Sequence, residues 1–317
     1  MFDLDFLGTA AAVPSADRGL PALLVSHGPD RFLIDCGEGT QRQLLRTGIG
    51  FRGLGPVLLT HAHLDHVAGL AGLVATRSLW RQAGAIEIIG SGETTDFVRR
   101  YLSVTVGGEN GYRLRVASPG VVLSRPGWRL HAFAVTHRST QSLGYCFEEE
   151  RRRPLLAERL AALGVPDGPA RRALAGGDPV TLADGRLIAP EMVRGPEFAG
   201  AKLAVVGDVE EVAPLTERVR AADALVIEAT FLDRDSGLAR SRGHLTAAAA
   251  ASLARAAGVG ELLLTHISGR DQPEEIRAEA ARTFPRTRVV DDFDHITVRR
   301  ADAEPLSPKT GDLADRS

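Results

Sequence analysis

The chain has 317 residues, enough for one large domain or two ordinary ones, and its 44% content of hydrophobic residues is typical of a globular protein. A formal net charge of −2 argues against a protein that coats nucleic acid by bulk charge, and two cysteines are too few for a disulfide scaffold or a thiolate zinc cluster. No apolar run of membrane-spanning length and no secretory leader is visible, so we expect a cytoplasmic protein without membrane contact.

The first segment predicts three strands and a helix. Alternating hydrophobicity indicates strands at 2–7, 22–26 and 31–35. The third strand ends at Asp35, a carboxylate suited to orient a metal-binding histidine, although a simple turn aspartate explains it equally well. Thr40 is expected to cap the helix that follows.

The segment 58–69, LLTHAHLDHVAG, organises the chemistry of the chain. Its apolar start predicts a buried strand, which delivers His61, His63, Asp65 and His66 at its carboxyl end. On a loop beyond a strand, the first two histidines can face one metal ion, and the other two residues a second ion. Polar loop residues or histidines satisfied in a core are the alternative, but they explain such a dense cluster poorly.

The middle of the chain predicts more strands and then an insertion. After the histidine cluster, a helix is expected to run to about Arg81. Strands are then expected near 86–89, 112–116, 121–124, 128–136 and 143–148, with a helix near 94–102. The strand at 128–136 leads to His137, another ligand-type residue. Segment 151–200 is rich in Gly and Pro and predicts a protruding arm with a short helix; its eight arginines against six acids fit a solvated surface.

The last third predicts regular alternation of strands and helices. Strands are expected at 203–206, 224–229, 261–265 and 288–293, and helices at 212–222, at 244–257 with His244 as the first residue, and before the last strand. These strands deliver Asp208 and His266 and carry Glu228. The sequence LLTH occurs at 58–61 and again at 263–266, which favours two pseudo-equivalent halves.

Two alternating runs enclose a block of antiparallel strands, which predicts an α/β fold of the αββα sandwich type, with two mixed sheets packed together and helices outside. Strand ends at one edge then supply seven metal ligands. The expected ligands are His61, His63 and His137 for one ion, Asp65, His66 and His266 for the other, and Asp208 as the bridge. Two metal ions about 3.5–4 Å apart polarise a phosphoryl oxygen and generate hydroxide, so hydrolytic chemistry is favoured.

With these residues in place, the sequence resembles the metallo-β-lactamase superfamily through THAHLDH, His137, Asp208 and His266. Within it, the sequence resembles the ribonuclease Z family of tRNA 3′-processing endonucleases. The motifs that carry this narrower resemblance are FLGT at 6–9, DCGEGTQRQL at 35–44, EATFLD at 228–233, GHLT at 243–246 and LLTHIS at 263–268. The resemblance implies one metallo-β-lactamase-like domain over 1–300 and a flexible tRNA-binding arm inserted at 151–200. The tail at 301–317 is polar and charged and contains proline, so we expect it to be disordered.

The resemblance also implies a function. It implies a zinc-dependent endoribonuclease that removes 3′ trailers from precursor tRNA, using a hydroxide shared by two Zn²⁺ per chain, with Mn²⁺ as an open alternative. Asp65 would help to activate the water, and His244, oriented by Glu228, would protonate the leaving oxygen. The arm of one subunit of a homodimer would serve the site of the other. The arm residues expected to grip RNA phosphates are Arg151, Arg152, Arg153, Arg171 and Arg172.

The sequence departs from the family pattern at two sites near the proposed proton donor. Ile227 stands where the family has histidine, and Leu245 stands where it has serine. Two other functions therefore stay open at this point. One is a binuclear metallohydrolase, a phosphodiesterase or esterase, that acts on smaller substrates, and the other is a non-catalytic RNA-binding protein on the same fold.

Overall fold

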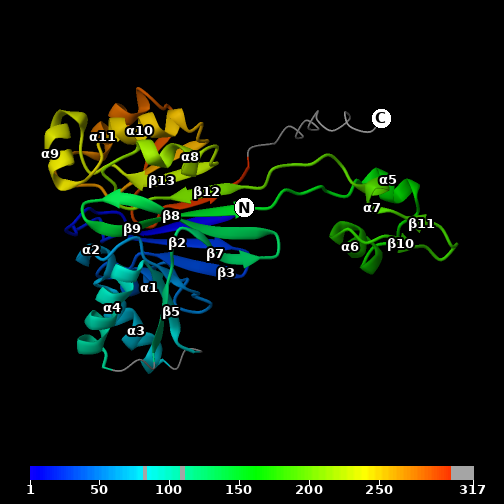
Figure 1. Ribbon diagram of the computed structural model, residues 1–317, viewed down its shortest axis with the longest axis horizontal. Coiled ribbons are helices and arrows are strands. Elements are labelled where there is room, and N and C mark those ends of the chain that lie inside the picture. Colours follow the sequence, from blue (N-terminus) through cyan, green and yellow to red (C-terminus); the bar gives the residue numbers. More distant parts are fainter. Residues whose placement is uncertain (81–83, 108–110, 301–317) are drawn as a thin grey trace, which may run out of the picture. The chain divides into compact units, whose positions relative to one another are not determined.

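The computed structural model describes residues 1–80, 84–107 and 111–300, so the tail expected at 301–317 lies outside the described residues. The chain forms two compact units (Figure 1). The first comprises Met1–Glu148 and Ala201–Arg299, and the second contains Glu149–Gly200. No helix in these described ranges is long and apolar enough to cross a membrane.

The first sheet of the larger unit has seven strands in the order β16-β1-β2-β3-β4-β5-β6. Its strands are β1 (Phe2–Gly8), β2 (Ala22–His27), β3 (Asp30–Ile34), β4 (Val57–Leu58), β5 (Ile86–Gly90), β6 (Tyr112–Val116) and β16 (His295–Val298). Pairing is antiparallel from β16 to β3 and parallel from β3 to β6, so the sheet is mixed.

The second sheet also has seven strands, in the order β15-β14-β13-β12-β9-β8-β7. Its strands are β7 (Gly120–Arg125), β8 (Trp128–His137), β9 (Thr140–Glu149), β12 (Lys202–Val205), β13 (Ala224–Glu228), β14 (Glu261–Thr265) and β15 (Thr287–Val289). Strands β12 to β15 are parallel, and β9 pairs antiparallel with β12. Every residue of β13 is buried, as expected for a strand covered on both faces.

The two sheets pack face to face and helices cover their outer sides (Figure 1). Between the sheets, Phe2 and Phe32 from one contact Trp128 and Phe147 from the other, with ring centroids 5.5–6.4 Å apart. The first sheet is covered by α1 (Thr40–Arg46), α3 (Leu70–Leu79) and α4 (Gly92–Thr105), and the second by α8 (Thr216–Val219), α10 (Ala247–Ala256) and α11 (Pro273–Ala281). The predicted α/β architecture, with two mixed sheets and outer helices, is confirmed.

Several local predictions about helices are wrong. Gly39, at φ 84°, is the N-cap of α1, while the Thr40 hydroxyl donates to the carbonyl of Gly37 instead. His244 does not begin a helix, because α10 starts after Thr246, whose hydroxyl accepts from the amide of Ala249.

The segment that follows the histidine cluster also differs from the prediction. Asp65 and His66 lie in a short helix, α2 (Leu64–Val67), rather than in a loop. The next helix, α3, ends at Leu79, and Arg81 lies outside the described residues.

The other differences concern missing or shortened elements. The helix expected at 212–222 contracts to a 3-10 turn (Ala213–Leu215), with Pro214 in its first turn, followed by α8, which ends where Arg220 takes a non-helical ψ of 128°. Helix α9 (Ser236–Arg242) was not expected. The last strand was expected at 288–293, but β15 ends at Val289 and β16 follows, paired with β1.

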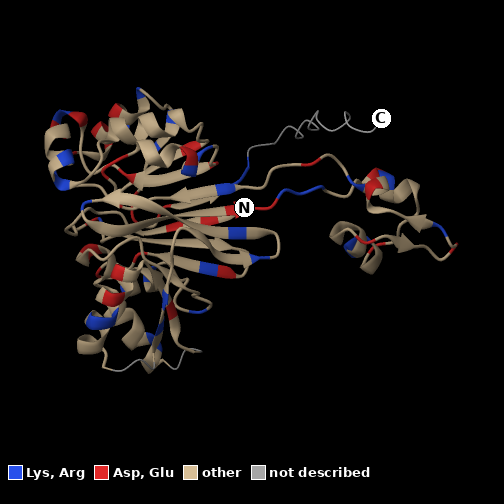
Figure 2. Ribbon diagram, viewed as in Figure 1, with Lys and Arg blue, Asp and Glu red and all other residues tan. Residues whose placement is uncertain are grey.

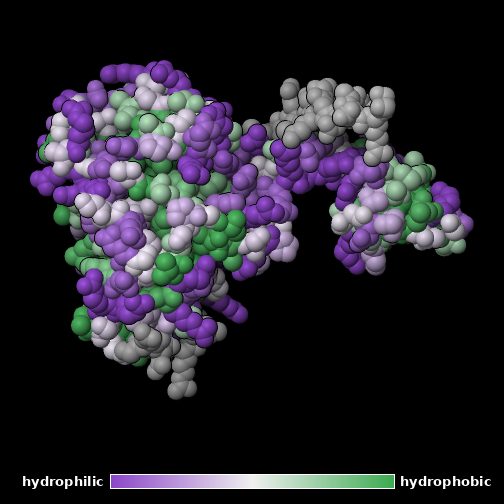
Figure 3. All heavy atoms as spheres, viewed as in Figure 1, coloured by the Kyte–Doolittle hydropathy of each residue, from purple (hydrophilic) through white to green (hydrophobic). Residues whose placement is uncertain are grey.

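The second unit, Glu149–Gly200, contains more regular structure than the single short helix expected. It has three helices and a two-stranded sheet: α5 (Ala157–Ala162), α6 (Pro169–Gly176), α7 (Pro190–Val193), β10 (Val180–Thr181) and β11 (Leu187–Ile188). A small core of its own stabilises it, built from Leu160, Val165, Leu174, Ile188 and Val193. Its surface mixes apolar and polar side chains (Figure 3), with Leu187 and Met192 exposed.

Candidate metal centre

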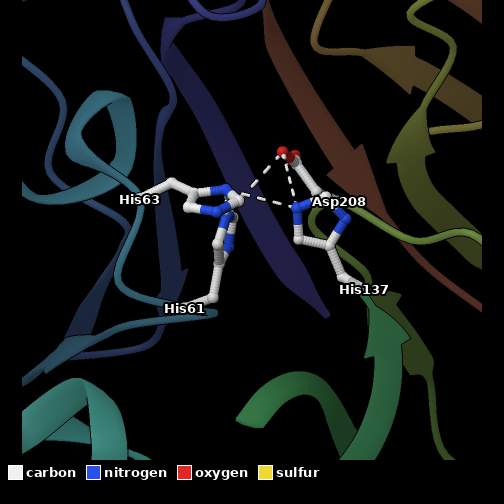
Figure 4. A group of neighbouring side chains, drawn as sticks. All are labelled: His61, His63, His137 and Asp208. Atoms are coloured by element: carbon white, nitrogen blue, oxygen red, sulfur yellow. Dashed lines mark hydrogen bonds and ion pairs between the residues drawn. The ribbon is translucent and has the colours of Figure 1, made fainter. Parts of the chain in front are cut away.

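Seven histidine and aspartate side chains, five from strand ends of both sheets and two from the short helix α2, meet at one edge of the sandwich. They form two adjoining groups, and within each group the nearest ligand atoms lie within 4.8 Å of one another. The groups are His61, His63, His137 and Asp208 (Figure 4), and Asp65, His66 and His266. His61 and His63 follow β4, Asp65 and His66 lie in α2, His137 ends β8, Asp208 follows β12, and His266 follows β14.

The carboxylate of Asp208 divides its two oxygens between the two groups. Its Oδ2 lies 3.7 Å from Nε2 of His61 and 3.8 Å from Nε2 of His137. Its Oδ1 lies 3.4 Å from Nε2 of His66 and 3.3 Å from Nε2 of His266. One buried carboxylate is therefore shared between two clusters of nitrogen atoms.

Three buried atoms at this centre have no hydrogen-bond partner, namely Asp208 Oδ1, His66 Nε2 and His266 Nε2. Unpaired buried polar atoms are costly and rare, so a converging set calls for a ligand. Burial alone would lower the pKa of His66, but the carboxylates of Asp208 and Asp35 outweigh it and raise that pKa well above its usual value. The negative charge around His66 thus favours a bound cation. The nitrogen and oxygen donors that converge there fit a divalent metal ion.

In the first half of the chain, hydrogen bonds fix which imidazole nitrogen faces the centre. His66 donates from Nδ1 to Asp35 Oδ2 over 2.8 Å. The same carboxylate accepts from the amide and the hydroxyl of Thr60, each over 2.8 Å. Because the single hydroxyl hydrogen of Thr60 is used, its oxygen accepts from Nδ1 of His61 over 3.0 Å. In the neutral tautomer that these hydrogen bonds select, both histidines direct Nε2 at the centre as the ligand atom.

Residues of the second sheet and the loops that follow its strands repeat this arrangement. Thr230 donates to Oε2 of Glu228 over 2.6 Å, and its oxygen lies 2.9 Å from Nδ1 of His266. His137 donates from Nδ1 to the carbonyl of Gly243 over 2.8 Å. Here too, Nε2 of each histidine is left as an acceptor directed at the centre.

Sequence reasoning missed Thr60, Thr230 and Gly243 as supporting residues. The two threonines carry a faint signal, since Thr60 immediately precedes a ligand in LLTH and Thr230 lies two positions after Glu228 in EAT. Gly243 acts through a carbonyl, which any residue possesses, so sequence alone offers no signal for it. Asp35, in contrast, lies where the sequence placed it, bonded to His66.

His63 differs from the other histidines because its Nδ1, rather than its Nε2, faces the centre. That atom lies 2.9 Å from Nε2 of His61 and 3.2 Å from Nε2 of His137. Burial lowers the pKa of all three imidazoles, which favours the neutral form that metal coordination needs. Three neutral rings that direct nitrogen atoms at one point are well placed to share a cation.

Two strand ends at the centre, one bearing the ligand His266 and one bearing Asp35, which orients His66, carry backbone strain. Asp35 has φ 58° and His266 has φ 56°, in the left-handed region that residues other than glycine rarely adopt. Such conformations cost free energy and persist where the surrounding structure enforces them, often at functional sites. Here they turn the side chains toward the shared edge.

A second pair of polar residues lies beside the metal centre. Glu228 is fully buried, and its Oε1 accepts from the amide of Val209 over 2.8 Å and from Nδ1 of His244 over 3.1 Å. Burial alone would lower the pKa of His244, but the hydrogen bond to Glu228 and the charges of Glu228 and Asp208 outweigh it and raise the pKa to about 9.

A cavity of about 770 Å³ opens over this centre. Its lining includes His63, Asp65, Asp208, His244 and His266. Asp65 accepts from the amide of Ala12 over 3.1 Å through the oxygen that lies 3.5 Å from His266 Nε2. We refer to this cavity as the cleft; its volume admits a nucleotide-sized group.

The five arginines expected in the arm divide into paired and unpaired residues. Arg151 pairs with Glu197, Arg153 with Glu191 and Arg171 with Asp167, at 2.6–3.2 Å. Arg152 and Arg172 are exposed, and within the described ranges their guanidinium groups have no ion pair. Along the ribbon of this unit, Figure 2 shows acidic residues interspersed with basic ones.

Comparison with known sequences places the chain in a family. Two family models match parts of it: one for the anti-Pycsar protein Apyc1 over residues 2–110, and one for a β-lactamase superfamily domain over residues 179–267. Ribonuclease Z of Bradyrhizobium diazoefficiens is 54% identical over 301 residues, covering 94% of this chain and all of that protein. Ribonuclease Z of Gemmatimonas aurantiaca is 36% identical, covering 90% of this chain and 93% of that protein.

Solved structures agree on the fold. A metallo-β-lactamase fold protein of Bacillus subtilis matches with a TM-score of 0.69 at 17% identity, and the short form of human tRNase Z matches with 0.67 at 24% identity. Each match covers 94% of this chain and the whole of the other. With both the centre and these relatives in view, the chain belongs to the ribonuclease Z family and has the metallo-β-lactamase fold.

Proposed function

We propose that the chain is a zinc-dependent endoribonuclease that removes 3′ trailers from precursor tRNA by phosphodiester hydrolysis. Its family makes it a hydrolytic, tRNA-processing endoribonuclease; the zinc and the site of cleavage are the proposal. The observation that carries it is the carboxylate of Asp208, which presents one oxygen to each of two histidine groups at the base of an open cleft.

The donor set supports two zinc ions per chain, held by the two groups of ligands described above. Histidine nitrogens and carboxylate oxygens without a thiolate suit zinc, and manganese is the alternative. When bound, two such cations would polarise a phosphoryl oxygen and lower the pKa of a water molecule. Protein purified and dialysed without chelator should carry stoichiometric metal, and a metal-free product that still cleaves RNA would contradict the proposal.

Asp65 and His244 are proposed to move the protons. Asp65 lines the cleft beside both His66 and His266, where its carboxylate can accept a proton from the attacking water. His244 donates from Nδ1 to Glu228, which leaves its other nitrogen to protonate the departing oxygen. A departing alkoxide needs such a donor, and general acid catalysis of this kind contributes about 10²–10⁴-fold.

Replacement of His244 tests this role. His244→Ala should keep its metal and lose most of its turnover, whereas His295→Ala, which alters an exposed histidine on β16 bonded to Asp5, should behave as the wild type. Metal content, thermal unfolding and single-turnover cleavage would be measured for both. Normal turnover of the His244 variant would remove this residue from the mechanism.

One pair of substrates separates the proposed activity from its two rivals. The protein would be incubated with a 3′-extended precursor tRNA and with bis(p-nitrophenyl) phosphate. Cleavage of both, with the RNA cut at its 3′ trailer, supports the proposal. Hydrolysis of the small ester alone favours a binuclear phosphodiesterase or esterase of smaller substrates, and RNA binding without any cleavage favours a non-catalytic protein.

The inserted segment 151–200 is proposed as a tRNA-binding arm on a single domain spanning 1–300, with Arg152 and Arg172 the arginines freest to meet phosphates. A clean deletion is available, because Arg152 and Phe198 form an antiparallel bridge with amide–carbonyl distances of 2.9 and 2.8 Å. Replacing 153–197 with Asn-Gly should preserve that bridge. The deleted protein should hydrolyse the small ester but bind precursor tRNA weakly.

The homodimer is proposed on the same basis, with the arm of one subunit serving the site of the other. Mixing the arm-deleted protein with His244→Ala should restore RNA cleavage. In a mixed dimer, the intact arm of the His244→Ala subunit can serve the intact metal site of the arm-deleted subunit. The two variants should be inactive on RNA separately. A mixture as inactive as its components, although mixed dimers form, would contradict the shared site.

A further inference from the structure

Three arginines line the same cleft as the metal centre: Arg138, Arg242 and Arg270. They come from three separate segments, since Arg138 lies between β8 and β9, Arg242 ends α9, and Arg270 lies in the loop after β14. None of them belongs to the ligand set or to the proposed proton donor. We call them the cleft arginines.

The cleft arginines are exposed, and over the described residues no carboxylate pairs with their guanidinium groups. Other arginines of the same unit are paired: Arg115 with Glu87 at 2.9 Å, and Arg234 with Asp271. Exposed arginines without an ion pair also occur away from the cleft, as at Arg240, so the informative observation is that three such guanidinium groups converge on the cavity over the metal centre. Guanidinium groups without a carboxylate are suited to bind phosphate oxygens.

Local packing brings the side chain of Arg138 to the end of α9, where Arg242 lies. Arg138 has φ 49°, and its amide donates to Glu210 Oε2 over 3.0 Å. Its aliphatic chain packs on Gly243, where an added Cβ would lie 2.7 Å from Arg138 Cγ. Gly243 immediately follows Arg242, so the Arg138 side chain lies against the neighbour of Arg242 in the chain, at the residue whose carbonyl orients His137. Basic residues on α9 are visible in Figure 2.

Apolar side chains lie at another part of the same cleft. Val13 is 71% exposed and Leu64 is 62% exposed, and both line the cavity. The hydrogen bond from the amide of Ala12 to Asp65 joins the two segments that carry them. Burial of exposed aliphatic groups against the face of a nucleobase is favourable in free energy, and unpaired guanidinium groups bind phosphates favourably. A single-stranded polynucleotide offers both groups, whereas a small diester offers one phosphate.

We propose that the cleft arginines hold backbone phosphates of an RNA strand that passes through the cleft, while Val13 and Leu64 contact a base beside the scissile phosphate. This inference rests on the proposed endoribonuclease function and deepens it. The cleft itself, independently of the arm, then gives the metal centre its preference for polynucleotides over small phosphodiesters.

The test compares Arg242→Ala with Arg240→Ala, which removes another exposed arginine of α9 that does not line the cleft. Arg138→Ala, Arg270→Ala and the triple variant complete the series. For each, kcat/KM is measured on 3′-extended precursor tRNA and on bis(p-nitrophenyl) phosphate. We expect the ratio of the two values to fall about tenfold for each cleft arginine, since a lost contact to a charged group costs about 1.5 kcal/mol, and every 1.4 kcal/mol is tenfold.

Salt dependence supplies a second readout that a merely structural role would not move. Each phosphate contact to a single strand contributes about 0.7 to the slope of log affinity against log salt concentration. The triple variant should therefore lower the magnitude of this slope by about 2, while Arg240→Ala leaves it at the wild-type value. Leu64→Ser should raise KM for RNA more than for the ester.

The possible failures are distinguishable. If the wild type hydrolyses the ester but never cuts RNA, the proposed function fails and this inference fails with it. If the wild type cuts RNA and the triple variant keeps both its substrate ratio and its salt slope, the cleft arginines have no such role and the endoribonuclease proposal stands. An Arg240→Ala effect equal to that of Arg242→Ala also overturns the inference, because general surface charge would explain both.

Discussion

Thr230 offers a test of the hydrogen-bond network that holds the metal centre. Its hydroxyl connects Glu228 to His266, with oxygen–oxygen and oxygen–nitrogen distances of 2.6 and 2.9 Å. Thr230→Val keeps the shape of the side chain but removes this group. The Nδ1–H of His266 then loses its acceptor in a buried site, and Glu228 loses a donor.

The size of the effect follows from burial. Glu228 is 0% exposed and His266 is 4% exposed, so water cannot readily replace the hydroxyl. Loss of a partner that orients a metal-binding histidine typically costs 10–100-fold in metal affinity, about 1.4–2.8 kcal/mol. We expect this loss at the group formed by Asp65, His66 and His266, while the group formed by His61, His63 and His137 keeps its affinity.

The assay is retention of zinc during titration with a competing chelator, with metal content measured at each step. Thr230→Ser restores the hydroxyl and should recover the wild-type curve. Thr246→Val is the matched control, because Thr246 is equally buried but caps α10, so its loss should cost about 1 kcal/mol of stability without changing zinc retention. Wild-type retention in Thr230→Val, or an equal loss in Thr246→Val, would refute the network as described.

Three further predictions concern other parts of the larger unit. Gly243→Ala and Gly258→Ala both force alanine into a left-handed conformation, at φ 75° and 63°, and each should lose about 1–2 kcal/mol of stability by thermal unfolding; only the first should also slow RNA cleavage, since open space surrounds the second. Burial raises the pKa of Cys36 to about 12 and that of Cys146 to about 11, so both stay protonated at pH 8 and should react with a thiol reagent only after unfolding; rapid labelling of native protein would contradict this. Asp208→Asn replaces a shared carboxylate oxygen with an amide and should fold but retain less zinc than the wild type, and undiminished zinc would argue against a bridging carboxylate.

Much of the fold could be predicted because its signals are local. Strands such as β1, β6 and β14 show in the alternation or clustering of apolar residues, and the sheets then follow from the order of strands and helices. Strand β16 was missed because its four residues, HITV, become a strand only by pairing with β1, nearly 300 positions away. The cap of α1 was assigned to Thr40 because hydroxyl residues favour that position, but the left-handed backbone required Gly39.

The sequence by itself determined the chemistry available to this protein: histidine and aspartate donors, placed where strands end, with no thiolate among them. Only the tertiary structure decided how those donors are used. The choice of nitrogen that faces the centre, the division of the Asp208 oxygens and the place of Thr230 depend on atoms brought together from both sheets. Residue type and spacing along the chain are local properties, whereas a hydrogen bond between distant segments exists only after the two sheets have packed.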